Sequence, residues 1–111
     1  PLEVFEDSEY MAVPPKYVKA ENYVLRVNGN SMIDDQIRDR DYIIVKRVET
    51  ANQGDTVVAL VNNEATLKRY YLGDKGVELH PQNSEFDTIH VQPEDHFRIN
   101  GIVLAVFREY N

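Results

Sequence analysis

The stretch around which this chain is organised is Tyr23-Val24-Leu25-Arg26-Val27-Asn28-Gly29-Asn30-Ser31-Met32. Its first six residues alternate in the face to which they point, with Tyr23, Leu25 and Val27 on one face, which predicts a strand with one solvent-exposed face. The Gly-Asn-Ser that follows is typical of a tight turn, because these residues tolerate left-handed backbone or bond to their own backbone. A serine on such a corner holds its hydroxyl out beside backbone N–H groups, as a nucleophile requires. An ordinary turn and a nucleophilic corner both fit this stretch.

A second stretch, Glu64-Ala65-Thr66-Leu67-Lys68-Arg69-Tyr70-Tyr71, places one lysine in a run typical of a strand. A serine nucleophile needs a base, and a Ser–Lys dyad is the variant that works without histidine. The three histidines of the chain lie in loop-like surroundings without an Asp–His pairing; they are His80, His90 and His96. Lys68 is therefore the candidate base for Ser31.

Lys68 can act as a base only when it is neutral. Its ordinary pKa of about 10.4 must fall by roughly three units to work near pH 7, which corresponds to about 4 kcal/mol. Burial supplies such a shift, because desolvation disfavours the charged amine. In an extended strand Lys68 shares a face with Thr66 and Tyr70, and Arg69 is left to solvent or to an ion pair. The alternative is a solvated Lys68-Arg69 pair, since lysine is rarely fully buried.

Composition indicates one soluble globular domain. The chain has 111 residues, 42% hydrophobic and 28% charged, which suits a single core and argues against disorder. It contains no run of about 18 apolar residues that could cross a membrane, and its first residues lack the pattern of a signal peptide. The absence of cysteine excludes disulfides and thiolate metal sites and fits a cytoplasmic protein.

The net charge of −7 argues against direct binding to nucleic acid. Such binding draws on a basic patch that releases counterions from phosphates, and no basic cluster stands out in the sequence. The three histidines are too dispersed for a metal site, so we expect neither a metal nor a cofactor. Asp39 and Asp41 are interpreted as turn residues rather than an acid–base pair.

The spacing of the apolar runs predicts an all-β fold built from short antiparallel strands in a strongly bent or barrel-like arrangement. The expected strands cover residues 23–28, 42–48, 56–61, 64–71, 77–80 and 97–107. Residues 31–36 are expected to form one helical turn with Ser31 as its N-cap, and Met32 to pack beneath the corner. Leu2, Val4 and Phe5 suit a short edge strand at the start of an acidic arm, and Asn83-Ser84 suits a turn.

Several segments occur in an order that resembles the LexA-type SOS repressors, and more broadly the self-cleaving serine peptidases that include phage repressors and UmuD. The resemblance is carried by Gly29-Asn30-Ser31-Met32, Ile37-Arg38-Asp39-Arg40-Asp41-Tyr42-Ile43-Ile44-Val45, Gly54-Asp55-Thr56-Val57-Val58-Ala59, Ala65-Thr66-Leu67-Lys68-Arg69, His80-Pro81-Gln82-Asn83-Ser84 and Gly101-Ile102-Val103-Leu104-Ala105-Val106. Together they run from about Tyr23 to the C-terminus. An ordered series of this length is far more specific than any one motif.

The resemblance implies a LexA/signal-peptidase-like fold and a division of labour in the site. Ser31 would be the nucleophile and Lys68 the base, and the backbone N–H groups of Asn30 and Ser31 would bind the oxyanion. In the family, Asn83-Ser84 would belong to a loop near the active cleft, although we interpret the pair as turn residues, and an incoming cleavage segment buries the lysine. The RecA–single-stranded DNA filament favours that state, so regulation is a conformational equilibrium biased by a partner.

Family members carry an N-terminal winged-helix DNA-binding domain and a hinge cleaved at Ala-Gly or Cys-Gly, and neither dipeptide occurs here. We therefore expect an arm over residues 1–22 that follows the cleavage site, and a peptidase and dimerisation domain over residues 23–111. DNA would be contacted only through the absent domain. A homodimer is expected, although Ala105 stands where many relatives have glycine in the last strand. A UmuD-like processed subunit of an error-prone polymerase and a phage-type repressor are the alternatives.

Overall fold

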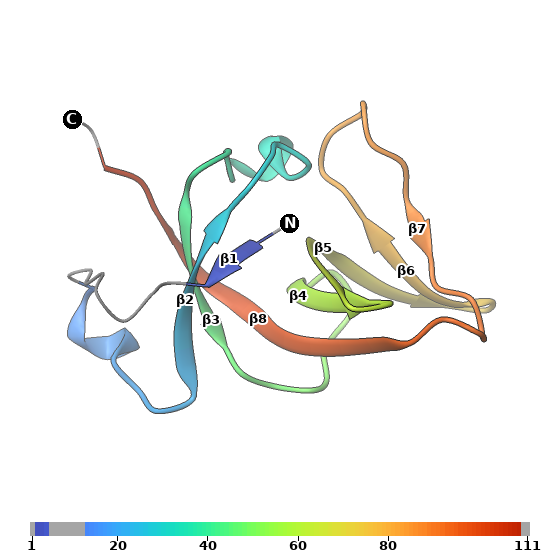
Figure 1. Cartoon of the computed structure of the whole chain (residues 1–111), viewed down its shortest axis with the longest axis horizontal. Helices are drawn as coiled ribbons and strands as arrows, with labels where there is room; N and C mark the ends of the chain where they lie inside the picture. Colours follow the sequence, from blue (N-terminus) through green and yellow to red (C-terminus); the bar gives the residue numbers. More distant parts are fainter. Residues whose placement is uncertain (1, 5–12, 110–111) are drawn as a thin grey trace.

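The computed structural model describes residues 2–4 and 13–109 of the chain. Eight strands form one antiparallel sheet in the order β1-β2-β3-β8-β4-β5-β6-β7 (Figure 1). Their bounds are β1 Leu2–Val4, β2 Asn22–Val27, β3 Tyr42–Lys46, β4 Thr56–Val61, β5 Glu64–Gly73, β6 Gly76–His80, β7 Ile89–His90 and β8 Phe97–Phe107. Two 3-10 helices, η1 (Pro15–Tyr17) and η2 (Ile33–Asp35), complete the described elements. The all-β prediction is confirmed. The sheet is bent but not a closed barrel, since β1 and β7 do not pair within the described residues.

The long strand β8 holds the two halves of the sheet together (Figure 1). Its second half pairs with β3 and its first half with β4, and the register shifts once along each pairing. Such irregularities bend a strand and increase its twist. The sheet can therefore turn over on itself, and one strand takes part in both halves.

Two clusters of apolar side chains form the core, and β4 contributes to both. Val58 belongs to the cluster built on β2 and β3, whereas Val57 and Ala59 belong to the cluster around Leu79 and Ile99. Successive strand residues point to opposite faces, so a strand buried on both faces reads as one continuous apolar run. The core therefore fills both sides of the sheet at β4.

Gly101 marks the place where β8 crosses β3 at close range. It is buried, and an ideal Cβ built on it would lie 2.6 Å from the carbonyl oxygen of Lys46 and overlap Val45. Nearby, the hydroxyl of Tyr23 donates a 3.0 Å hydrogen bond to the carbonyl of Asn100. Only a residue without a side chain fits this crossing.

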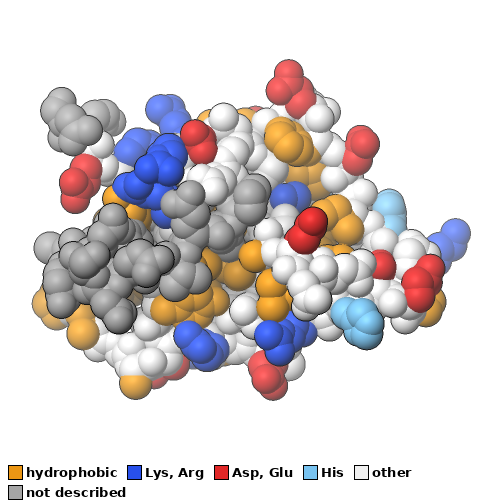
Figure 2. Space-filling view, viewed as in Figure 1, with side chains coloured by type: hydrophobic (Ala, Val, Ile, Leu, Met, Phe, Trp, Pro, Cys, Tyr) orange, Lys and Arg blue, Asp and Glu red, His pale blue; other side chains and the backbone are white. Residues whose placement is uncertain are grey.

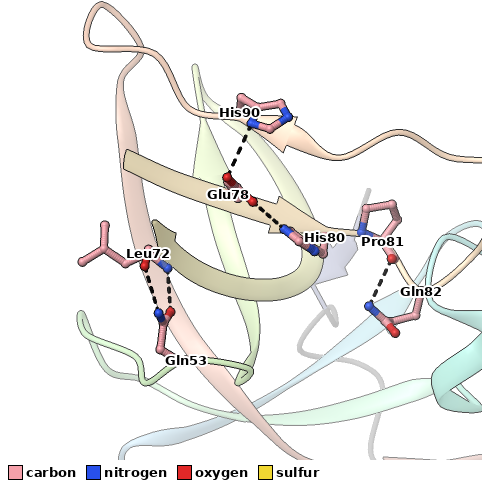
Figure 3. Close-up of polar contacts among 7 residues, drawn as sticks. All are labelled: Gln53, Leu72, Glu78, His80, Pro81, Gln82 and His90. Atoms are coloured by element: carbon pink, nitrogen blue, oxygen red, sulfur yellow. Dashed lines mark hydrogen bonds and ion pairs between the residues drawn. The ribbon is translucent and has the colours of Figure 1, made fainter. Parts of the chain in front are cut away.

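The predicted strands are found with shifted ends. β5 runs on to Gly73, where the side-chain amide of Gln53 bonds to both backbone groups of Leu72 at 2.8 and 2.6 Å (Figure 3). β3 ends earlier than predicted, at Lys46, and β7 was not predicted because two residues give no readable alternation. Asn62 and Asn63 both have positive φ, 51° and 70°, the backbone of the tight hairpin that was predicted.

The start of the chain agrees in part with the predicted edge strand. β1 pairs antiparallel with β2, with Glu3 opposite Arg26, and it lies at one edge of the sheet. Phe5, which was assigned to the same strand, lies outside the described residues, as do residues 6–12. The helices of the described part are too short and too polar to cross a bilayer.

The expectation that the chain has no basic cluster is wrong for the folded chain. Four arginines line one cavity of about 360 Å³; they are Arg26, Arg38, Arg40 and Arg108. They come from distant points of the sequence, so the sequence did not reveal the group. Asp39, Asp41 and Glu109 line the same cavity, which offsets most of the charge. In Figure 2 the largest group of basic side chains on the visible face lies at one end, and acidic ones are spread over the rest.

Candidate active site

The side chains of Ser31 and Lys68 meet where a turn lies against a strand. The turn after β2, Gly29-Asn30-Ser31, is called the corner below. Gly29 has a φ of +89°, a backbone conformation that favours glycine. Lys68 lies on β5. The Nζ atom of Lys68 is 3.0 Å from the Oγ atom of Ser31. The structure thus brings together the two side chains that the sequence singled out.

The predicted N-cap role of Ser31 is wrong. The 3-10 helix η2 begins at Ile33 after Met32, and no side chain caps it. The hydroxyl of Ser31 faces Lys68 instead. Met32 is 1% exposed in the core, so its predicted packing position is confirmed.

Lys68 is buried, with 8% of its surface exposed. Its Nζ atom also donates to the hydroxyl of Thr66 at 2.7 Å and to the carbonyl of Leu67 at 3.1 Å. No acidic side chain in the described part of the chain forms an ion pair with it. Burial therefore acts without a compensating charge and lowers the pKa of Lys68 below 10.5. The solvated-pair interpretation is wrong for this residue.

The three partners of Lys68 suit the neutral amine as well as the charged one. A neutral amine keeps two N–H donors and gains one lone pair. Thr66 and Leu67 can accept the two donors, and the hydroxyl of Ser31, which both donates and accepts, can turn its proton toward the lone pair. Loss of one proton thus leaves every group paired and directs the lone pair at Ser31.

The lowered pKa predicts a pH dependence of stability. Between the folded-state pKa of Lys68 and 10.5, the unfolded chain binds more protons than the folded one, so the free energy of unfolding rises with pH in that window. Lys68→Met lacks this titration. We expect the free energy of unfolding of the wild type, measured by denaturant titration, to gain on that of Lys68→Met as the pH rises toward 10.5. A constant difference across the window would mean that the pKa is not lowered.

Asp39, in the segment between β2 and β3, is hydrogen-bonded to the corner. Its carboxylate accepts the N–H of Gly29 at 2.7 Å, and its own N–H donates to the side-chain oxygen of Asn30 at 2.9 Å. Asp39 and Asp41 lie in the turn that was predicted for them. Asp41 is buried in addition and accepts two bonds from the guanidinium of Arg108 at 2.7 Å each, a partner that the sequence did not indicate.

An ion pair ties the serine segment to the lysine strand. The guanidinium of Arg69 donates two hydrogen bonds to the carboxylate of Asp35, at 2.8 and 2.6 Å. Asp35 belongs to η2, directly after the corner, and Arg69 is the strand neighbour of Lys68. The alternation of the strand sends Arg69 and Lys68 to opposite faces. The prediction that Arg69 is left to solvent or to an ion pair is confirmed as an ion pair.

The loop after β6 lies against the corner. The N–H of Gln82 donates to the carbonyl of Ser31 and the N–H of Asp34 donates to the carbonyl of Gln82, both at 2.7 Å. The side chain of Asn83 donates to the carbonyl of Asn30 at 2.8 Å. Asn83 does form the predicted turn, because its side-chain oxygen accepts the N–H of Glu85, but the turn reading missed its contact with the corner.

The backbone N–H groups of Asn30 and Ser31 have no acceptor among the described residues. Both N–H groups can therefore donate to an acceptor that reaches Ser31. A cavity of about 760 Å³ also lies beside Thr66, lined in part by Val61, Ala65 and Ile89. Thr66 lines this cavity and also accepts a hydrogen bond from Lys68.

No histidine is hydrogen-bonded to Ser31 or Lys68 in the described part of the chain, although His80 pairs across the strands with Arg69. Glu78 stands between His80, at 2.8 Å, and His90, at 3.9 Å (Figure 3), and the backbone N–H of His96 bonds to Asn62. The described residues contain no cluster of three His, Cys, Asp or Glu side chains suited to a metal ion. Thr66 and Asn83 are the site residues to which the sequence assigned no role in the chemistry. The strand face that Thr66 shares with Lys68 gave one signal, and the resemblance, which placed Asn83 in a loop near the active cleft, gave the other.

Comparison with known proteins identifies the family of the chain. Residues 2–104 match the family model described as Peptidase S24-like. The chain is 47% identical to the LexA repressor of Syntrophotalea carbinolica, over 99% of this chain and 55% of that protein. It is 40% identical to the LexA repressor of Syntrophobacter fumaroxidans and 39% identical to that of Pseudothermotoga lettingae, over 99% and 98% of this chain and 53% and 56% of those proteins. The chain thus spans little more than half the length of these relatives. It belongs to the Peptidase S24-like family of serine peptidases.

Proposed function

We propose that this chain is the self-cleaving and dimerisation domain of a LexA-like SOS repressor, with Ser31 as nucleophile and Lys68 as general base. One observation carries the proposal: a buried lysine, with no carboxylate partner among the described residues, lies 3.0 Å from the serine hydroxyl. Burial of the amine costs stability and lowers its pKa. A lysine on the surface would have no such cost, and burial would not lower its pKa. This is the environment that a lysine base requires.

The chemistry follows from the two side chains. Neutral Lys68 takes the proton of the Ser31 hydroxyl while Oγ bonds to the carbonyl carbon of the scissile peptide. Lys68 then gives the proton to the leaving amine as the C–N bond breaks, which leaves an ester on Ser31. Water hydrolyses that ester by the same proton transfers in the second half of the reaction, and Ser31 and neutral Lys68 are restored.

The open N–H groups of Asn30 and Ser31 are the proposed oxyanion donors. Negative charge grows on the carbonyl oxygen only as Ser31 attacks, so donors placed beside Ser31 stabilise the transition state more than the substrate. The side chain of Asn30 is already bonded to Asp39, and only its backbone takes part. The cavity beside Thr66 is the proposed path of the cleaved segment.

The names of the relatives support a role in the control of transcription. All three compared proteins bear the name LexA repressor, and the chain covers about half of each. We propose that the longer protein binds DNA through a separate upstream domain, acts in the cytoplasm and cleaves itself when a RecA–single-stranded DNA filament stimulates it. Leu104 and Val106 of β8 are 39% and 38% exposed and share one strand face, which suits the proposed homodimer. The shared name favours the repressor over a UmuD-like polymerase subunit.

A cleavage assay in trans tests the peptidase. The substrate joins the upstream part of the Syntrophotalea carbinolica repressor to this chain with Ser31→Ala, so that it cannot cleave itself. The wild-type chain is expected to cut this substrate at one bond upstream of the chain, faster as the pH rises from about 7 to about 10. Ser31→Ala added as enzyme is expected to leave the substrate intact. Equal cutting by both enzymes would reject the proposed nucleophile.

A further inference from the structure

A side chain from the loop after β6 is hydrogen-bonded to a backbone carbonyl of the corner. The side-chain N–H of Asn83 donates a 2.8 Å hydrogen bond to the carbonyl oxygen of Asn30. That carbonyl belongs to the same peptide group as the N–H of Ser31. Peptide groups are planar, and in the trans form the C=O and N–H point in opposite directions. No cis peptide occurs in the described chain. The carbonyl also accepts the backbone N–H of Ile33 at the longer distance of 3.2 Å, so the two bonds together fix where the Ser31 N–H points, and that of Asn83 is the shorter.

We infer that Asn83 is a positioning residue that orients and polarises the Ser31 peptide group, so that its N–H serves as an oxyanion donor. This inference rests on the proposed function, since it assigns a task within that reaction. Asn83 itself touches no reacting atom. Its bond opposes a rotation of the peptide that would swing the donor away from the oxyanion. Such preorganised donors contribute because they need no rearrangement during the reaction.

The orientation of the Asn83 amide is determined by two different partners. Its Oδ1 atom accepts the N–H of Glu85 at 2.9 Å, while its Nδ2 atom donates to Asn30. Exchange of the two atoms would set donor against donor and acceptor against acceptor. The direction of the bond to Asn30 therefore follows from the contacts on both sides.

The backbone next to Asn83 is also held against the corner. Gln82 receives the N–H of Asp34 on its carbonyl and gives its own N–H to the carbonyl of Ser31. The two peptide groups on either side of Ser31 are thus both held through their carbonyls, one by Asn83 together with the N–H of Ile33 and one by Gln82. Only the bond from Asn83 comes from a side chain, and so only it can be removed without changing a backbone donor.

Two variants separate the donor from the turn. Asn83→Asp keeps an oxygen for the N–H of Glu85 but replaces the donor to Asn30, and Asn83→Leu removes the donor without adding charge. We expect both to lower the plateau rate of trans cleavage about 10- to 100-fold, less than the loss of a whole oxyanion donor. The midpoint of the pH–rate profile should not move, because Lys68 is untouched. Ser84→Ala, an exposed neighbour, should cleave like the wild type.

A structural measurement accompanies the kinetics and does not depend on activity. The carbonyl 13C resonance of Asn30 reports the hydrogen bond that it accepts, and it should shift in both Asn83 variants and stay in place in Ser84→Ala. A plateau rate like that of the wild type in Asn83→Leu, a moved pH midpoint, or an unshifted Asn30 resonance would each overturn the inference. If the wild type itself fails to cleave, the proposed function fails. The Asn30 resonance then decides separately whether Asn83 holds this peptide.

Discussion

Lys68→Met is expected to lower the rate of trans cleavage by about 10²- to 10⁴-fold, the range that a positioned general base contributes. Methionine fills nearly the same space but has no basic nitrogen, so the hydroxyl of Ser31 keeps its proton. The pH dependence should change as well. The wild-type rate rises until Lys68 has lost its proton, at a pH below 10.5 because burial lowers that pKa. Lys68→Met should lose this rise.

Lys75→Met is the matched control for this substitution. Lys75 is exposed in the turn between β5 and β6, so the same chemical change there should leave both the rate and its pH profile as in the wild type. Equal losses in the two variants would point to a general effect of removing positive charge. A Lys68→Met enzyme that retains the wild-type rate would exclude Lys68 as the base.

Gly101→Ala is expected to lower the free energy of unfolding by about 1–3 kcal/mol, the usual cost of overpacking a core. The added methyl group would lie 2.6 Å from the backbone carbonyl of Lys46. Backbone atoms in a paired strand cannot move aside as the end of a flexible side chain can. β8 and β3 must therefore separate, and β8 joins the two halves of the sheet. Denaturant titration measures the loss.

Gly73→Ala controls for the chemical change itself. Gly73 also lies in a strand, but a Cβ there would approach Glu78 no closer than 3.5 Å, an ordinary contact with a flexible side chain. Its free energy of unfolding should stay within about 0.5 kcal/mol of the wild-type value, as for most surface changes. If Gly101→Ala were as stable as Gly73→Ala, the close crossing of β8 over β3 would be wrong.

Much of the fold could be read from alternation and turn residues. The strand before Ser31, the Asn62-Asn63 hairpin and the long apolar strand at the end of the chain all follow from local patterns. Strand order could not be read in this way, because pairing of β8 with both β3 and β4 is set by packing between distant residues. The cavity lined by four arginines was not predicted for the same reason, since Arg26, Arg38, Arg40 and Arg108 come together only in the folded sheet.

The candidate site was likewise predictable only where its residues carry a local signal. Ser31 and Lys68 carry signals in the sequence, a glycine-preceded corner and a lysine in a strand, and the resemblance assigned their chemistry. The burial of Lys68 needed the structure, because a lysine beside an arginine on a strand is as readily solvated as covered. Asn83 and Asp35 act through contacts with the corner and with Arg69 from other segments. Locally they look like ordinary turn and surface residues, and only the resemblance, which placed Asn83 in a loop near the active cleft, distinguished one of them.

The most direct test is a comparison of two titrations of the wild-type chain. The side-chain resonances of Lys68, assigned by their loss in Lys68→Met, give its pKa by NMR, and trans cleavage gives the midpoint of the pH–rate profile. We predict that the two midpoints coincide and lie below the ordinary lysine value of 10.5. A Lys68 that titrates at its ordinary pKa, or a rate profile with a different midpoint, would contradict the Ser31–Lys68 dyad.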